Sequence, residues 1–167
     1  MAVQIPAQAI VDAKAGAGEL WEVVLAIAGP ESSWRADAIG DCKLYKGGPI
    51  VPCTTPRAQP YSFGYLQMYT DGGLGDGHSA AELLDGPANF RLGAEYIRRR
   101  LAGGASLYAA LSPWTTRDAA WALYQRIKSE GIEPVGSAVA PGPTFTGAGP
   151  LLMVALLGLL WLVLDSI

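Results

Sequence analysis

Apolar residues recur at helical spacing in several stretches of the chain, and Gly- and Pro-rich segments separate these stretches. Residues 19–28, ELWEVVLAIA, place four apolar side chains at i, i+3, i+4 and i+7: Leu20, Val23, Val24 and Ile27. This spacing predicts a helix with one buried face. We expect the helix to end near Gly29 and Pro30, because proline lacks a backbone donor and clashes with the preceding turn.

Capping signals mark two further helices. Ser79 and Glu82 form a capping-box pattern that opens a short helix to about Leu84. Pro87 is suited to the first turn of a longer helix, and the Gly-Gly pair at 103–104 closes it.

The last helix of this region is predicted to start at Thr115, with Asp118 as its reciprocal capping acid, and to end at Gly131. Its expected core-facing side chains are Ala120, Leu123, Tyr124 and Ile127. Strands are expected to be few, because no segment alternates apolar with polar residues for long. Residues 1–131 therefore predict one mainly α-helical domain.

The strongest change in composition lies near the C-terminus. Residues 150–164 read PLLMVALLGLLWLVL, and no charged residue occurs between Glu133 and Asp165. This pattern predicts a transmembrane helix over residues 148–167, with the lipid bilayer as partner, after a Gly- and Pro-rich linker over residues 132–147. A helix buried in a partner protein is one alternative. A helix lying on the membrane surface is disfavoured, because its apolar residues would lie all round.

Composition and charge exclude one class of partner. Only 16% of the residues are charged and the net charge is -3, so no basic surface for nucleic acid is expected. Cys42 and Cys53 predict either a small disulfide, which would place the domain outside a reducing cytosol, or two free thiols. The single histidine, His78, has no second ligand at metal-binding spacing, so no metal or other cofactor is predicted.

Three short motifs carry polar residues suited to carbohydrate chemistry: AGPESSW at residues 28–34, SFGYLQM at 62–68 and NFRLGAEYI at 89–97. Glu31 stands where a mostly buried helix runs into a loop, a place where an isolated carboxylate is normally solvated. Gly64 allows close backbone approach, and Gln67 can hydrogen-bond an amide-bearing sugar.

In this order the motifs resemble the soluble lytic transglycosylase domain and, more distantly, the goose-type lysozymes, both of the lysozyme superfamily. The resemblance covers residues 15–125. The resemblance implies a catalytic role for Glu31. It implies substrate-binding roles for the further matching residues Ser32, Trp34, Gly64, Gln67, Asn89 and Tyr96, and Gly93 also matches the third motif. Tyr65, Phe90 and Ile97 replace the usual Leu, Ile and Leu, and Tyr65 is included among the expected binding residues. The resemblance implies a lysozyme-like fold.

A fourth family element, an Ala-Tyr-Asn-x-Gly stretch that carries a tyrosine into the groove, has no match in the chain. Residues 107–116, LYAALSPWTT, occupy its place and offer Tyr108 and Trp114, and the sequence leaves open which aromatic lines the site. Trp34 and Trp114 are candidates for stacking on sugar rings. Residues 40–60, which hold both cysteines, separate the first two motifs and are expected to form one lip of the groove.

The resemblance implies that Glu31 is the catalytic residue of a peptidoglycan lytic transglycosylase. A half-buried glutamic acid has a raised pKa and can protonate a glycosidic oxygen. In the family the same glutamate then acts as base on the muramyl 6-hydroxyl, which closes an anhydro ring without water. A muramidase, the alternative, usually needs a second carboxylate roughly 5–9.5 Å away. The loop candidates, which are more often turn residues, are Asp37, Asp41, Asp71 and Asp76.

Two functions without catalysis stay open as hypotheses. One is a glycan-binding or virion scaffold, and the other is a membrane-permeabilising protein of the holin type, which leaves the three motifs unexplained. The N-terminus has no pattern of a Sec signal peptide. With a cell-wall substrate and a C-terminal anchor, this favours a phage enzyme carried in the virion or its membrane, with other virion proteins as partners. A bacterial inner-membrane enzyme is the second choice.

Overall fold

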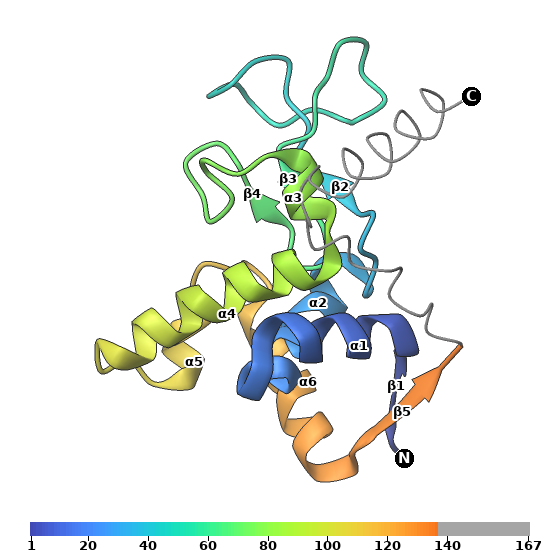
Figure 1. The fold of residues 1–167 in the computed structure, drawn as a ribbon. Coiled ribbons are helices and arrows are strands. Elements are labelled where there is room, and N and C mark those ends of the chain that lie inside the picture. The colour runs from blue at the N-terminus through green and yellow to red at the C-terminus, as the bar shows by residue number, and fades with distance from the viewer. Residues whose placement is uncertain (137–167) are drawn as a thin grey trace, which may run out of the picture.

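Helices dominate residues 1–136, the part of the chain that the computed structural model describes (Figure 1). The prediction of a mainly α-helical fold is confirmed. In chain order the helices are α1 (Ala7–Ala17), the 3-10 turn η1 (Gly18–Leu20), α2 (Trp21–Ser32), α3 (Ala80–Leu84), α4 (Gly86–Ala102), α5 (Leu107–Ala110) and α6 (Arg117–Glu130).

The strands are short and form two small sheets. β1 (Val3–Pro6) pairs in parallel with β5 (Ile132–Val135), so the two ends of the described chain lie side by side (Figure 1). The other sheet is antiparallel in the order β2 (Ile39–Gly40), β3 (Ser62–Phe63), β4 (Met68–Tyr69). The long loop between β2 and β3 projects from this sheet, on the side away from β1 and β5 (Figure 1).

Helix α2 forms the centre of the hydrophobic core and packs against α1, α4 and α6. The apolar face predicted for residues 19–28 is buried, since none of its four side chains is more than 9% exposed. From α4, Phe90, Ala94 and Ile97 are fully buried. The core thus holds the helix that leads to Glu31 as a rigid element.

The predicted end of α2 was wrong. The helix continues through Gly29 and Pro30 to Ser32, and Ser33 ends it in the left-handed region at φ 53°, donating its N–H to the carbonyls of Ala28 and Gly29. Proline removes only one backbone donor, and here packing of the last turns outweighs that loss. A Cβ at Gly29 would lie 2.6 Å from the Leu123 side chain of α6, so this glycine permits close helix packing.

Periodicity did not reveal α1, because its buried side chains are mostly alanines rather than large apolar residues. Ala9, Ala13 and Ala17 are fully buried. A Cβ at Gly16 would collide with the backbone carbonyl of Pro87 in α4. Small residues therefore allow α1 and α4 to pack closely. They leave no strong apolar stripe in the sequence.

The predicted capping box is half formed at α3, where the Glu82 carboxylate pairs with His78 and Arg91 instead, and it is absent at α6. Ser79 accepts a hydrogen bond from the Glu82 N–H at the start of α3. α6 begins at Arg117 rather than Thr115, and Asp118 does not complete a capping box, because its carboxylate accepts from the Tyr108 hydroxyl instead.

The predicted linker over residues 132–147 begins too early. Its first four residues form β5, because pairing with β1 satisfies their backbone groups. The remainder of the linker, beyond residue 136, and the predicted membrane helix over residues 148–167 lie outside the described residues. Within residues 1–136, no helix is both long and apolar enough to cross a membrane.

Candidate active site

A groove of about 640 Å³ lies beside the C-terminal end of α2. Its walls come from that helix end, the loop after β2, the β3–β4 hairpin with its following loop, α4 and the segment before α6. Four of the predicted site residues line it: Glu31, Gln67, Tyr96 and Trp114. The groove therefore brings together residues from all three sequence motifs and from residues 107–116.

Glu31 occupies the last turn of α2 and is half-buried. Burial raises the pKa of its carboxyl group, hydrogen bonds from the Thr116 hydroxyl and N–H oppose this rise, and the negative charge of Asp41 adds to it. The carboxyl group is thus held at one oxygen by Thr116 and faces an open groove. This is the environment that a general acid requires.

Thr116 is a site residue that the sequence interpretation missed. Its hydroxyl donates to Glu31 Oε1, across 85 positions of the chain. The Thr-Thr pair at residues 115–116 looked like an ordinary helix cap, and its only hint of another role was the position directly after Trp114.

Ser32 does not line the groove but holds the C-terminal end of α2 in place. Its hydroxyl oxygen lies 2.8 Å from the Tyr65 carbonyl of the β3–β4 turn and 3.1 Å from the Ala28 carbonyl. The Glu-Ser pair thus couples the acid to the turn that carries Gln67. Trp34 has a similar supporting role, because its indole N–H donates to the Leu25 carbonyl at 2.9 Å.

Gly64 and Asn89 fix the β3–β4 turn rather than contact the groove. Asn89 is fully buried, accepts from the Leu66 N–H at 2.9 Å and donates to the Phe63 and Leu83 carbonyls. Gly64 has φ +74°, and a Cβ there would lie 2.5 Å from Asn89 Nδ2. The motif residues at 64 and 89 are therefore two halves of one packing contact.

Gln67 lines the groove in an unusual backbone conformation, with φ 46°. Its side-chain NH₂ donates to the carbonyls of Gly64 at 2.9 Å and Ala38 at 3.2 Å. These bonds orient the amide, so it is preorganised before any ligand arrives.

Tyr65 is buried and lies outside the groove. Its ring stacks on Phe90 with centroids 4.4 Å apart, and its hydroxyl donates to the buried Asp12 at 2.9 Å. The Tyr65 hydroxyl thus links the turn to α1.

Trp114, and not Tyr108, is the aromatic from residues 107–116 that lines the groove. Its indole N–H donates to the Leu66 carbonyl at 3.0 Å, and its ring meets Tyr96 edge-on at 6.0 Å. Tyr108 packs against Trp121 and donates to Asp118, away from the groove lining. The expected binding role of Tyr108 has no geometric support.

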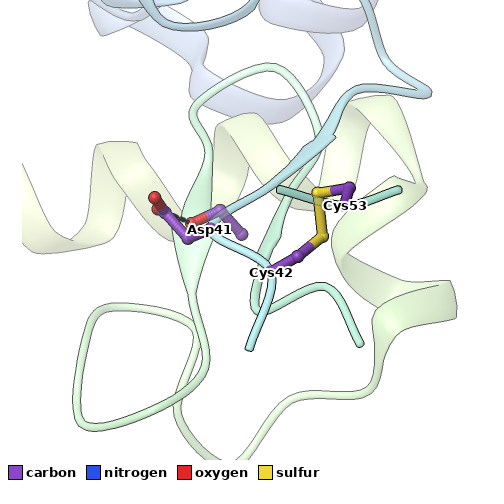
Figure 2. Close-up of a disulfide and its surroundings, with 4 residues drawn as sticks. Asp41, Cys42 and Cys53 are labelled. Carbon is purple, nitrogen blue, oxygen red and sulfur yellow. Dashed lines mark hydrogen bonds between the residues drawn. A yellow bond between two sulfur atoms is a disulfide. The ribbon is translucent and has the colours of Figure 1, made fainter. Parts of the chain in front are cut away.

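Asp41 brings a second carboxylate into the groove, and of the four loop aspartates only Asp41 lines it. It accepts a hydrogen bond from the Ser62 hydroxyl, and Figure 2 shows its side chain pointing away from the neighbouring disulfide. The other three form ion pairs instead: Asp37 with Arg35, Asp71 with Lys43 and Asp76 with Lys46.

The Cys42–Cys53 disulfide closes the loop after β2, with Cα atoms 5.0 Å apart (Figure 2). Of the two states that the sequence left open, the structure has the bridge. Ile50, inside the bridged loop, is 62% exposed and lines the groove. The expected lip of the groove is therefore present. A nearly buried ion pair, Lys43 Nζ to Asp71 Oδ2 at 2.7 Å, fastens it to the loop after β4.

Among the described residues, no group of three or more His, Cys, Asp or Glu side chains could hold a metal ion. The groove itself holds two carboxyl groups, those of Glu31 and Asp41, which can transfer protons. No protein-family model, no curated protein and no solved structure matches the chain.

Proposed function

We propose that this protein is a peptidoglycan lytic transglycosylase with a lysozyme-like fold, acting on the MurNAc-GlcNAc β-1,4 bond of glycan strands. The observation that carries the proposal is Glu31, a half-buried acid with a raised pKa, in a groove with Gln67, Tyr96 and Trp114. Aromatic and amide side chains are the groups that bind N-acetylated sugar rings.

The proposed reaction uses one carboxyl group twice. Protonated Glu31 gives its proton to the glycosidic oxygen, the C1–O bond breaks, and positive charge develops at C1, where the substrate N-acetyl group stabilises it. The Glu31 carboxylate then takes the proton of the muramyl 6-hydroxyl as that oxygen bonds to C1. The acid is regenerated and no water is consumed.

The test is mass spectrometry of the products that the full-length protein releases from purified peptidoglycan, beside its Glu31→Gln variant. Anhydromuramyl products from the parent, with a loss of at least about a thousandfold in the variant, would support the proposal. The absence of products from both folded proteins would overturn it and favour a glycan-binding scaffold.

A muramidase is the second candidate, and Asp41 is the observation that favours it. Asp41 lines the same groove as Glu31 and is held by Ser62, so it could accept a proton from an attacking water. Asp41→Asn separates the two reactions. A muramidase would release reducing-end products and lose them in this variant, whereas a transglycosylase would keep its anhydromuramyl products.

The place of action is proposed from the sequence alone. The apolar residues 150–164 support attachment to a membrane, and a virion-borne phage enzyme is the favoured setting. Flotation of the full-length protein with lipid vesicles tests the attachment. Recovery in the soluble fraction would contradict it.

A further inference from the structure

A second cavity of about 490 Å³ adjoins the groove, along the exposed side of α4. Tyr96 and Leu74 line both cavities, so they form the wall between them. Tyr96 meets Trp114 of the groove edge-on, and the remaining lining of the second cavity continues along α4 and into the loop at His78. A chain leaving the groove past Tyr96 would enter this cavity.

The lining contains three guanidinium groups, of which two are paired with carboxylates and one is not. Arg91 lies 3.1 Å from Glu95 and 3.7 Å from Glu82, and Arg98 lies 2.8 Å from Glu19. Arg99 has no side-chain hydrogen bond or ion pair within the described part of the chain, and it is exposed.

Arg99 lies close to the groove along α4. It follows Tyr96 by three residues on α4, which is a rise of about 4.5 Å along the helix. It also lies four residues after Glu95, so both stand on one face of the helix. An unpaired guanidinium therefore stands about one turn beyond the wall of the groove.

We propose that this cavity binds the stem peptide of peptidoglycan, with Arg99 pairing with one of its carboxylates. This inference rests on the proposed function. The stem leaves the muramyl ring through a lactyl group, and three extended residues span about 10 Å, which exceeds the rise of about 4.5 Å from Tyr96 to Arg99 along α4. The guanidinium fork suits a planar carboxylate, and Leu74 and Leu92 offer apolar contact to the peptide.

The charge pattern favours a peptide over a polyanion such as a teichoic acid. Glu95 lines the cavity, Glu82 borders it through Arg91 and His78, and the chain as a whole has a net charge of -3. Because Arg91 and Arg98 are already paired with carboxylates, Arg99 offers one positive charge to a ligand, which matches a single carboxylate better than a polyphosphate.

The test compares two substrates: glycan strands with their stems, and the same strands stripped of peptide by an amidase. The measured quantity is kcat/KM on strands with stems divided by kcat/KM on stripped strands. It is determined for the full-length protein, Arg99→Gln and Arg100→Gln. Arg100 is the matched control, because it is exposed and adjacent but does not line the cavity. We expect the ratio to fall about tenfold in Arg99→Gln and to keep its parental value in Arg100→Gln.

An unchanged ratio in Arg99→Gln would overturn the inference even if the enzyme is active. If the parent cleaves neither substrate, the proposed function fails, and binding decides the inference separately. A free stem tetrapeptide titrated into the labelled protein should then shift the Arg99 side-chain NMR signal in the parent and in Arg100→Gln. The absence of that shift would overturn the inference.

Discussion

At the scale of single residues, the contact between Thr116 and Glu31 sets the protonation of the proposed acid. The Thr116 hydrogen bonds lower the Glu31 pKa against the larger effect of burial. A general acid must be protonated, so kcat/KM falls as pH rises through its pKa. Thr116→Val removes the hydroxyl donor, raises the pKa of Glu31 further and should move this fall to higher pH in a pH-rate profile.

Thr116→Ser is the matched control, because it keeps the hydroxyl group. Its profile should coincide with that of the parent. A Thr116→Val profile that stays in place, or moves to lower pH, would show that the hydroxyl does not act on the group that titrates.

Backbone conformation and close packing explain why a glycine stands at position 64. It has φ +74°, and an added Cβ would collide with the Leu83 carbonyl, whereas Gly77 has φ +85° with open space around it. Gly77→Ala should lower the free energy of unfolding by about 1–2 kcal/mol, for the backbone conformation alone. Gly64→Ala should cost about 1–3 kcal/mol more, for overpacking. Urea unfolding of both variants measures the difference, and equal losses would contradict it.

At the scale of elements, strong capping signals and large apolar stripes were predictable, and tertiary packing decided the rest. The apolar face of α2 and the Ser79 cap of α3 follow from local sequence. The passage of α2 through Pro30 depends on the fit of Gly29 against α6, which no local pattern contains. Similarly, α1 is stabilised by α4 through small residues that carry little periodic signal.

In the candidate site too, local sequence predicts some residues and tertiary folding decides the others. Glu31, Gln67 and Tyr96 were predictable from motifs and line the groove, whereas the sequence left open the choice between Trp114, which lines it, and Tyr108, which does not. Asp41 could not be distinguished from the other loop aspartates by sequence, because only folding of the loop after β2 brings it to the groove. Motif membership also did not separate residues that face the groove from those that support it.

The two loops beside the groove depend on the Lys43–Asp71 ion pair. The Asp71 hydrogen bond raises the Lys43 pKa to about 12, and both side chains are nearly buried, at 8% and 10% exposed. Lys43→Met leaves the Asp71 carboxylate without its cation, so it should lower the melting temperature and speed proteolysis of residues 43–60. Lys46→Met, which breaks the exposed pair with Asp76, is the control and should change neither. Equal behaviour of the two variants would contradict this role.

At the scale of the whole molecule, the N-terminal segment closes the described fold by pairing with the segment that follows α6. In β1, Ile5 is fully buried while its neighbour Gln4 is exposed, so alternate residues of one strand face the core and solvent. This pairing joins residues about 130 positions apart, Val3 with Ile132 at one end and Pro6 with Val135 at the other. The closure therefore depends on the long-range register and on the buried face of β1.

Ile5→Ala tests whether this closure stabilises the whole domain. Loss of a fully buried Ile side chain should lower the free energy of unfolding by about 2–5 kcal/mol, because it removes apolar burial and leaves a cavity. Gln4→Ala, on the exposed side of the same strand, should change it by less than about 0.5 kcal/mol. Urea unfolding followed by circular dichroism measures both. If Ile5→Ala were as mild as Gln4→Ala, the pairing of β1 with β5 would be a peripheral attachment, and the domain would be stabilised by its helices alone.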